Sequence, residues 1–547
     1  MQDNSNSKKT KILIICGVLL IAAVSAMWTL SVKPLNNHEC FVSITSREML
    51  ASGDWVWPTC NGEPRLAKTP LSYWLVASLA QVTGKIDEFT TRLPSALAGI
   101  LSVAAILYFV SRILSFRIAV ISSCVWATTL SYFRYSHNAR PEMVLMLFIT
   151  LCFLSFYAAV TADTRRRQVV YMLTFWISFA LANMAKGPAP LPLVLVPLFF
   201  YVVIFRKWKF IARMLPIVGP IVFLAVVIPW PLAIAGRLNW DLVVWKREFV
   251  DRFFGSYGSS GKPVYYYFLI MFQFIIPWVA FLPSALAAPF FKVWHEKRLA
   301  MQFLWLWFVV GLVFITVSAG KRQHYILPMM PAMAILIGII IEDMAFSRKA
   351  HTIKNAADTL RYHVIVLIGG AVGGTIYLAL KYPEMVGGAI ILAILTIITV
   401  GSVAFLFVKG KPAYACGSLF GGIIILVMLS YVSFFNPLNY NEPSRHFTLN
   451  AAKKVPKADK LIAYKSASTR FIHYFGRQVP KVQSKEEAHQ LYEQGVWIVA
   501  FGQFLDELLE NNDLEIVYIE ENAERHQQNK VAGALLHKSK SEVQSGS

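Results

Sequence analysis

The chain has 547 residues, of which 56% are hydrophobic and 15% charged, and its mean hydropathy is +0.52. A composition this apolar excludes a water-soluble protein and indicates an α-helical, polytopic membrane protein. Lys and Arg outnumber Asp and Glu by 52 to 31. Basic cytoplasmic loops of a membrane protein explain this excess, so it does not indicate nucleic acid as a partner.

The first apolar segment, residues 12–32, follows Lys8, Lys9 and Lys11. It is longer than the hydrophobic region of a typical signal peptide and has no convincing small-x-small cleavage site. We therefore expect it to be the first transmembrane helix.

The polar stretch at 33–91 is predicted to be a first extracytoplasmic loop with juxtamembrane helices. Thr45 and Glu48 form a capping-box pattern, and Gly53 supplies a stop, which predicts a short helix between them. Cys40 and Cys60 share this loop, and their spacing alone leaves open whether they form a disulfide.

Four residues of the same loop carry chemistry. His38 and Glu39 lie near its start, and Arg65 and Lys68 lie near its middle. An acid and cations at the membrane rim could serve one common site. A lone loop histidine, or a lysine that reaches from the apolar surface to water, is the structural alternative.

A helix needs roughly 20 apolar residues to cross a bilayer. About thirteen segments meet this requirement. Every second connection between them is short and contains Lys or Arg, so the positive-inside rule predicts a cytoplasmic N-terminus. The odd number then predicts an external C-terminus. The predicted spans are 12–32, 92–112, 117–134, 141–162, 168–186, 189–205, 212–235, 264–285, 301–319, 323–344, 362–380, 385–408 and 414–434.

The chain after residue 435 has a different character from the apolar part. Strand-like runs alternate there with a helix that Ser484 and Glu487 would open. We therefore expect a transmembrane domain at 1–435, an extracytoplasmic α/β domain at 436–536 and a disordered tail at 537–547.

Ionisable residues gather in the predicted outer loops. Glu142 begins the fourth span, Arg252 lies in the second large outer loop at 236–263, and Lys321 and Tyr325 belong to the turn GKRQHY. Transport pathways instead place charges within the spans. Glu142 could also act only as a helix-terminal acid.

Lys and Arg at this rim suit a lipid-linked phosphate, since both neutralise phosphoryl oxygens. A nearby carboxylate can serve as a general base or stabilise an oxocarbenium-like centre. No strong metal-ligand spacing and no Walker or dinucleotide loop occurs in the sequence.

Five sequence motifs together resemble one family. They are REMLASGDWVWP, NGEPRLAKTPLSYW, MAKGP, PWPLAIA and SAGKRQHYILPMMPAMAIL. They resemble the polyprenyl-phosphate-sugar-dependent glycosyltransferases of the C-type superfold. The resemblance is strongest to the lipid A aminoarabinose transferases and extends more broadly to the dolichyl-phosphate-mannose protein mannosyltransferases. The resemblance implies a bacterial inner-membrane enzyme of the hexosyl- or pentosyltransferase class.

The resemblance also implies roles for individual residues. Glu39 and Glu142 match the acidic positions of the family, with His38 standing where an Asp is usual. Lys68 falls on a phosphate-contacting lysine, and Arg252 on a loop arginine assigned to the same phosphate. Lys321 and Tyr325 match the turn of the family pattern. Arg65, a cation of the first loop, is assigned with them to the expected donor-phosphate site.

The implied partners are a polyprenyl-phosphate-linked sugar, a lipid, protein or glycan acceptor, and the membrane lipids. No cofactor is certain from the sequence, and whether a divalent metal ion binds is left open. Ala67 stands where aminoarabinose transferases carry an acid, and this departure bears on metal binding. The alternatives are a transporter or flippase of lipid-linked sugars and a non-catalytic relative that binds the carrier lipid.

Overall fold

The computed structural model describes residues 2–66, 68–241, 243–246, 261–349, 353–430, 443–510, 514–521 and 531–538. The chain divides into two compact units. Unit 1 contains Met1–Leu30, Ala67–Ser72 and Arg92–Phe435, and unit 2 contains Ser31–Leu66, Tyr73–Thr91 and Asn436–Ser547. Residues of the first predicted outer loop therefore cluster with residues of the C-terminal part. Arg252 and residues 539–547 of the predicted tail lie outside the described residues.

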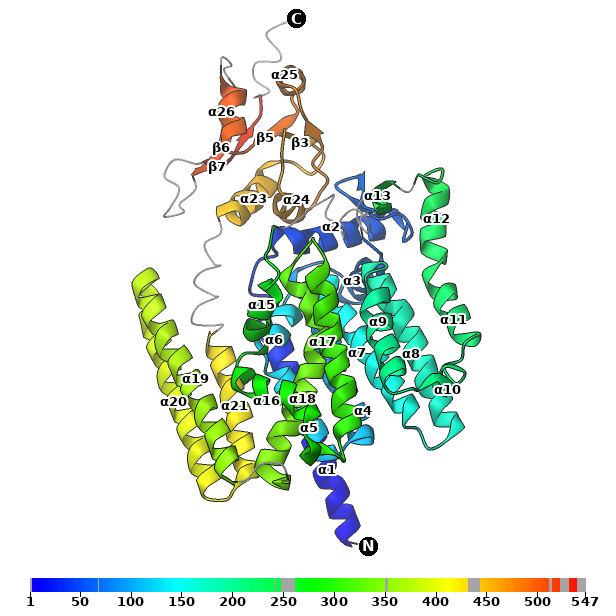
Figure 1. Ribbon diagram of the computed structural model, residues 1–547. Coiled ribbons are helices and arrows are strands. Elements are labelled where there is room, and N and C mark those ends of the chain that lie inside the picture. The colour runs from blue at the N-terminus through cyan, green and yellow to red at the C-terminus, as the bar shows by residue number, and fades with distance from the viewer. Residues whose placement is uncertain are drawn as a thin grey trace, which may run out of the picture. The chain divides into compact units, whose positions relative to one another are not determined.

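Unit 1 is helical over its described length (Figure 1). Its helices are α1 (Gln2–Met27), α4 (Glu88–Ile113, which starts in unit 2), α5 (Phe116–Ala127), α6 (Leu130–Ser136), α7 (Pro141–Val160), α8 (Arg165–Lys186), α9 (Pro190–Ile204), α10 (Trp208–Ile211), α11 (Val218–Val227), α12 (Pro229–Arg237), α13 (Val243–Trp245), α15 (Tyr266–Ile275), η2 (Trp278–Phe281), α16 (Leu282–Ala287), η3 (Ala288–Phe290), η4 (Lys292–Trp294), α17 (Arg298–Val317), η5 (Gln323–Met329), α18 (Met330–Glu342), η6 (Asp343–Ser347), α19 (Ile353–Lys381), η7 (Pro383–Met385), α20 (Val386–Val408) and α21 (Pro412–Ser430).

Ten helices among the described residues are long and apolar enough to cross a membrane, and two bent pairs raise this number to 12. The pairs are α5 with α6, bent by 61°, and Tyr266–Ile275 with Trp278–Phe290, bent by 117°. The predicted segment 189–205 forms the shorter apolar helix Pro190–Ile204. The apolar pattern thus located these helices but did not reveal the two bends.

Two spans form the core of unit 1. The candidate span of α7 is 83% buried and that of η5–α18–η6, Gln323–Ser347, is 89% buried. In contrast, the spans of α19 and α20 are only 6% and 11% buried, although the two helices pack against each other (Figure 1). The most enclosed helices are therefore α7, which has Glu142 in its first turn, and the helix that begins in the GKRQHY turn.

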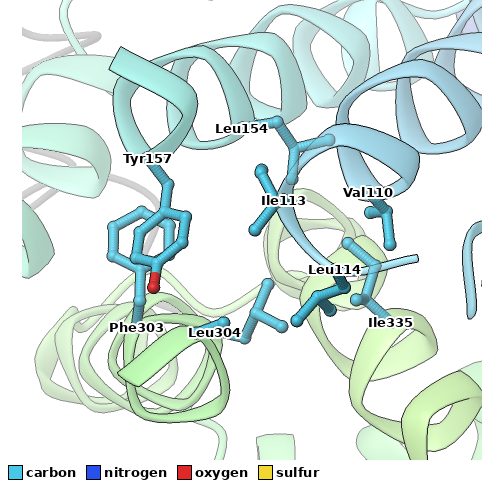
Figure 2. Close-up of a pocket in the computed structure, with 9 residues that line it drawn as sticks. Val110, Ile113, Leu114, Leu154, Tyr157, Phe303, Leu304 and Ile335 are labelled. Carbon is cyan, nitrogen blue, oxygen red and sulfur yellow. The ribbon is translucent and has the colours of Figure 1, made fainter. Parts of the chain in front are cut away.

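A small apolar hollow lies between α4, α7, α17 and α18 (Figure 2). Leu154 and Tyr157 line it from α7, and Leu304 lines it from α17. Leu154 stands about 18 Å along the helix axis from Glu142, at 1.5 Å per residue. No Asp, Glu, Lys, Arg, His or Cys lines the hollow, and it is separate from the residues that carry chemistry.

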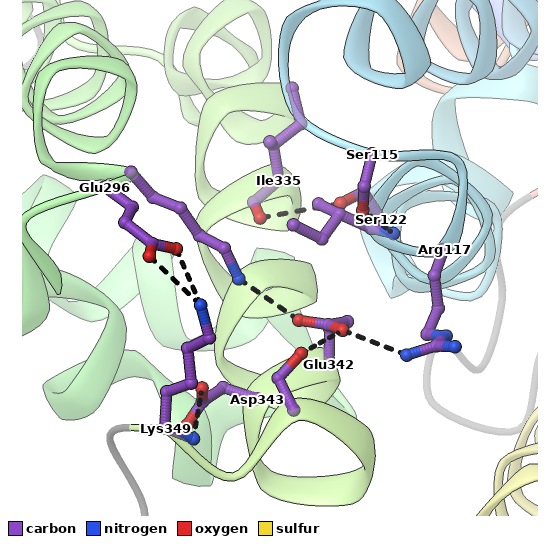
Figure 3. A network of polar contacts seen from close by, with 11 residues as sticks. Ser115, Arg117, Ser122, Glu296, Ile335, Glu342, Asp343 and Lys349 are labelled. Carbon is purple, nitrogen blue, oxygen red and sulfur yellow. Dashed lines mark hydrogen bonds and ion pairs between the residues drawn. The ribbon is translucent and has the colours of Figure 1, made fainter.

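A buried carboxylate ties α5, α17 and η6 together at the far end of α18 (Figure 3). Glu342 is 4% exposed. Its oxygens lie 3.4 Å from Arg117 Nη1 and 3.2 Å from Lys297 Nζ, and one accepts a hydrogen bond of 2.6 Å from Ser347 Oγ. The Lys349–Glu296 ion pair beside it is exposed. This cluster closes the end of the bundle opposite the GKRQHY turn.

Unit 2 contains a mixed sheet of five described strands in the order β4-β3-β5-β7-β6 (Figure 1). Strand β3 pairs in parallel with β4 and β5, and β7 pairs antiparallel with β5 and β6. The elements are α2 (Asn37–Ser52), β1 (Thr59–Cys60), β2 (Glu63–Pro64), α3 (Leu71–Thr83), α23 (Pro443–Lys454), β3 (Leu461–Tyr464), α24 (Thr469–Phe475), β4 (Lys481–Val482), α25 (Lys485–Glu493), β5 (Trp497–Ala500), α26 (Gln503–Leu509), β6 (Ile516–Glu521) and β7 (Val531–Leu536).

Helix α2 begins eight residues before the predicted capping box. The structure places Asn36 at its N-cap, with Glu39 as the reciprocal partner, while Thr45 and Glu48 lie inside the helix. Both pairs fit the spacing of a capping box, and the earlier one forms the helix start. The predicted stop is confirmed, since Gly53 ends α2 with a φ of 71°, a conformation that glycine adopts without steric cost.

The first loop and the C-terminal segment share one hydrophobic core. Leu35, Cys40 and Ile44 pack with Phe447 and Phe471 among its buried residues. Cys60 is partly buried against this core, yet no disulfide joins it to Cys40.

Polar bonds extend the same contact. Asn61 Nδ2 donates to Val479 O at 2.8 Å, and Val479 N donates back to Asn61 Oδ1 at 2.7 Å. Arg47 donates to the carbonyls of Ile472 and His473 at the end of α24, where a cation also interacts favourably with the helix dipole. The C-terminal α/β segment thus holds α2 and the hairpin that follows it.

Candidate active site

The site in unit 1 is organised by the first turn of α7. Pro141 occupies the first helical turn, where its missing N–H leaves no bond unmade. Glu142 follows and is 5% exposed. Its Oε1 lies 3.0 Å from Lys186 Nζ and 3.3 Å from His324 Nε2. Glu142 is therefore held by side chains of two other segments.

Lys186 reaches this carboxylate because it ends α8, which packs along α7 (Figure 1). Gly187 caps the helix with a φ of 66°. The side chain of Lys186 is 16% exposed, and its Nζ lies 5.0 Å from the centroid of the Tyr325 ring. At this distance the ring face attracts the ammonium. Lys186 thus links Glu142 to the GKRQHY turn.

Hydrogen bonds and a ring contact hold the GKRQHY turn in place. Tyr267 of α15 donates its hydroxyl to the carbonyl of Arg322 at 3.1 Å, and its oxygen accepts from the Arg322 N–H at 3.1 Å. The rings of His324 and Tyr325 meet edge to face, with centroids 4.9 Å apart. Lys321 is 9% exposed, and its Nζ donates to Ser318 O at 2.9 Å.

The segment that carries Lys68 lies beside the end of α8. The backbone N–H of Gly187 donates to Thr69 Oγ1 at 3.1 Å. Lys68, the neighbour of Thr69, is half-buried. The structure therefore brings the Lys68–Thr69 segment, Glu142 and the GKRQHY turn to Lys186 within one unit.

Two donors of this site were not among the residues predicted from the sequence. Lys186 belongs to the MAKGP motif, and His324 to GKRQHY, but neither was expected to contact Glu142. Glu142 begins one predicted span and Lys186 ends the next, so both lie at the same side of the membrane, and this topology is the signal that could have found Lys186. His324 offered no such signal, because its contact depends on the fold of the turn.

The remaining predicted site residues that the structure describes lie in unit 2. Glu39 is 1% exposed, and its Oε2 accepts from the backbone N–H of Asn36 at 2.9 Å and from Asn36 Nδ2 at 2.7 Å. His38 is exposed on the first turn of α2. The Arg65 guanidinium lies 3.8 Å from the centroid of the Phe41 ring and donates from Nε to Tyr73 Oη at 3.2 Å. Glu39 and Arg65 thus have structural roles as well.

A buried histidine links α2 to α24. His473 is 7% exposed, and its Nδ1 lies 2.8 Å from Ser43 Oγ. Burial lowers the pKa of His473 to about 3, with a further lowering from Arg47 and Arg445 that outweighs Glu39 and Asp87. His473 is therefore neutral in the folded protein near neutral pH.

Part of the chain is similar in sequence to a protein family and to several relatives. Residues 67–232 match the family model described as dolichyl-phosphate-mannose-protein mannosyltransferase. An undecaprenyl phosphate-alpha-4-amino-4-deoxy-L-arabinose arabinosyl transferase of Proteus mirabilis is 27% identical over 348 residues, 61% of this chain and 60% of that protein. A Yersinia enterocolitica protein of the same name is 28% identical over 318 residues, 56% of this chain and 55% of that protein. The aligned part thus spans about three fifths of these relatives.

The similarity to solved structures covers nearly the whole chain. ArnT from Cupriavidus metallidurans bound to undecaprenyl phosphate matches with a TM-score of 0.83 and 17% identity, over 97% of this chain and 98% of that chain. The chain has the C-type glycosyltransferase fold. The Archaeoglobus fulgidus oligosaccharyltransferase matches more distantly, with a TM-score of 0.53 and 11% identity over 89% of this chain and 69% of that chain. The fold and the family resemblance predicted from the sequence motifs are confirmed.

Proposed function

We propose that this protein is a multi-pass membrane glycosyltransferase of a bacterial inner membrane that moves a sugar from a polyprenyl phosphate to an extracytoplasmic lipid, protein or glycan. The observation that carries the proposal is the buried Glu142 carboxylate, held by Lys186 and His324 beside the Lys68–Thr69 segment. The fold shared with ArnT and the arabinosyl transferase relatives support the same reading.

The location of these charges favours an enzyme over a transporter. Glu142 is in the first turn of α7, and Lys186 is in the last turn of α8. Transporters bind their substrate near the bilayer midplane, between discontinuous helices. Charges at helix ends instead suit a substrate whose phosphate lies at the headgroup layer. We place this end of the bundle outside the cytoplasm, with the N-terminus inside.

The donor phosphate is the leaving group of the proposed reaction. A phosphate departs without a strong acid, so the protein's task is to stabilise the negative charge that develops on it. We assign this task to Lys68 and Lys321. Tyr325 and Arg65 are proposed as further contacts of the phosphate. Arg252, which lies outside the described residues, is proposed as another. Lysine supplies three donors on a compact charge.

The acids act on the acceptor. Glu142 orients the acceptor or takes its proton, because it is buried next to the proposed phosphate site. Glu39, with His38 as a helper near neutral pH, is the second proposed acid. One oxygen of Glu39 already accepts two hydrogen bonds from Asn36. We therefore assign the main role at the acceptor to Glu142.

The described residues do not fit a divalent metal site. No group of three or more His, Cys, Asp or Glu side chains gathers among them in a way that could hold an ion. At Glu142 the ammonium of Lys186 lies where a cation would otherwise balance the carboxylate. In the proposed reaction the protein's own side chains therefore carry each role.

A transfer assay tests the proposal. The full-length protein is reconstituted with a labelled polyprenyl-phosphate sugar, and released carrier phosphate is measured together with sugar that crosses the vesicle membrane. Release by the wild type is expected to fall at least about 100-fold in Glu142→Gln and Lys68→Ala, the range for loss of a catalytic group or charge stabilisation. Asp163→Asn, an exposed acid between α7 and α8, is the matched control. Sugar crossing without release would indicate a transporter, and binding alone a non-catalytic relative.

A further inference from the structure

The contacts of Glu142 are unequal at its two oxygens. Lys186 Nζ and His324 Nε2 both lie within 3.3 Å of Oε1. Oε2 is buried and accepts no hydrogen bond from the residues that the structure describes. A carboxylate in a merely structural ion pair would gain most by sharing its donors between both oxygens, so this arrangement needs a different explanation.

A buried acceptor without a donor is costly, because the oxygen has left water and gained nothing in return. Such an atom in a native site indicates a partner that the protein itself does not supply. A carboxylate oxygen can only accept, so the missing partner brings an O–H or N–H hydrogen. The same rule places the hydrogen of His324 on Nε2, the atom that faces Oε1.

We propose that His324 and Lys186 are positioning residues: together they fix Glu142 through Oε1 and present Oε2 to the reacting hydroxyl of the acceptor. This inference rests on the proposed function and assigns a task to two side chains that had no predicted role, although they lie in the MAKGP and GKRQHY motifs. His324 sets the angle of the carboxylate, and Lys186 keeps it ionised.

The proton and electron balance of the step is simple. The acceptor oxygen forms a bond to the anomeric carbon, and the bond from that carbon to the phosphate oxygen breaks. The electron pair of the broken bond leaves with the polyprenyl phosphate, and the acceptor proton passes to Glu142 Oε2. A hydroxyl acceptor supplies this proton. A doubly ionised phosphate monoester has no proton to give, and its charge would be repelled by the Glu142 carboxylate, so the step requires a hydroxyl.

The test is a double-mutant cycle in the reconstituted full-length protein, read by release of labelled carrier phosphate. His324→Ala is expected to lower kcat about tenfold or more, because Glu142 Oε2 is no longer oriented toward the acceptor. The KM for the donor is expected to change less than about twofold, because the phosphate site is intact. His324→Gln, whose amide can donate in place of Nε2, is expected to recover most of the loss. His295→Ala, at an exposed histidine after η4, is the control.

The cycle separates positioning from packing. In a Glu142→Gln background, His324→Ala is expected to change kcat less than about twofold, because its effect acts through the carboxylate. Additive losses, or equal kcat values for wild type and His324→Ala, would overturn the inference while leaving the proposed function intact. Transfer confined to a phosphate acceptor would overturn it too. A wild type that releases no carrier phosphate would instead refute the proposed function.

Discussion

Lys186 is the residue on which the buried charge of the site depends. Its ammonium balances Glu142, and side-chain exposures of 16% and 6% place both groups largely out of water. Removing one member of such a pair leaves the other charge buried without compensation. The same cation lies against the Tyr325 ring, so its loss would disturb the GKRQHY turn as well.

Lys186→Met should therefore destabilise the protein by about 3–5 kcal/mol, the range for breaking a buried ion pair. Thermal unfolding in detergent measures this against Lys349→Met, which removes an exposed pair with Glu296 and should change the melting temperature little, because water screens exposed pairs. Adding Glu142→Gln to Lys186→Met should restore part of the loss. Equal melting temperatures for the two single variants would contradict a buried pair at this site.

The residue-level site was only partly predictable from the sequence. Glu142, Lys321 and Tyr325 stand out because they are polar residues at the ends of apolar spans. The contact of Lys186 with Glu142 crosses 44 residues, and it exists only because α8 returns alongside α7. The sequence predicted a capping box at Thr45, whereas the structure starts α2 at Asn36, and the choice between the two positions depends on the core that α2 joins. The local sequence pattern predicts neither the Lys186–Glu142 contact nor the start of α2.

At the scale of elements, α2 is held by the C-terminal segment, and the contact contains a neutral histidine. The pKa of His473 in the fold is about 3, against an ordinary value of 6.5. Between these values the unfolded chain binds a proton that the folded protein does not. Stability is therefore complete above about pH 6.5 and is lost as the pH falls.

The contact between α2 and α24 should weaken by about 2 kcal/mol between pH 7 and pH 5. Hydrogen exchange of the α2 and α24 amides, corrected for the intrinsic pH dependence, measures this change. His473→Gln, which cannot take up a proton, should show little pH dependence over the same range. Protection that falls equally in both proteins would show that His473 is not the responsible group.

The Glu342 cluster is a second element-level contact, at the other end of the bundle (Figure 3). Glu342→Gln weakens two ion pairs, and because Arg117 is 56% exposed we expect a loss of about 1–3 kcal/mol rather than the full value for a buried pair. Thermal unfolding against Glu296→Gln, a change at an exposed pair, checks this. Carrier release per folded molecule should be unchanged in Glu342→Gln, and a selective loss of release would contradict a structural role.

At the scale of the whole molecule, the apolar pattern predicted the spans and the charge pattern predicted their orientation. Single cysteines in a background without the native six test the orientation. Ser466→Cys, between β3 and α24, should react with a membrane-impermeant thiol reagent in intact cells. Lys411→Cys, just before α21, should react only after the membrane is opened. The reverse pattern would contradict a cytoplasmic N-terminus and an external C-terminal segment.

Photo-crosslinking tests most directly whether the cluster around Glu142 receives the carrier lipid. The reconstituted protein is illuminated with a polyprenyl phosphate that carries a diazirine next to its phosphate, and the labelled peptides are identified by mass spectrometry. We predict labelling of the peptides that contain Lys68, Lys186 and residues 320–325, suppressed by excess unlabelled polyprenyl phosphate. Labelling confined to the exposed helices α19 and α20, or unaffected by competitor, would contradict a donor site at this cluster.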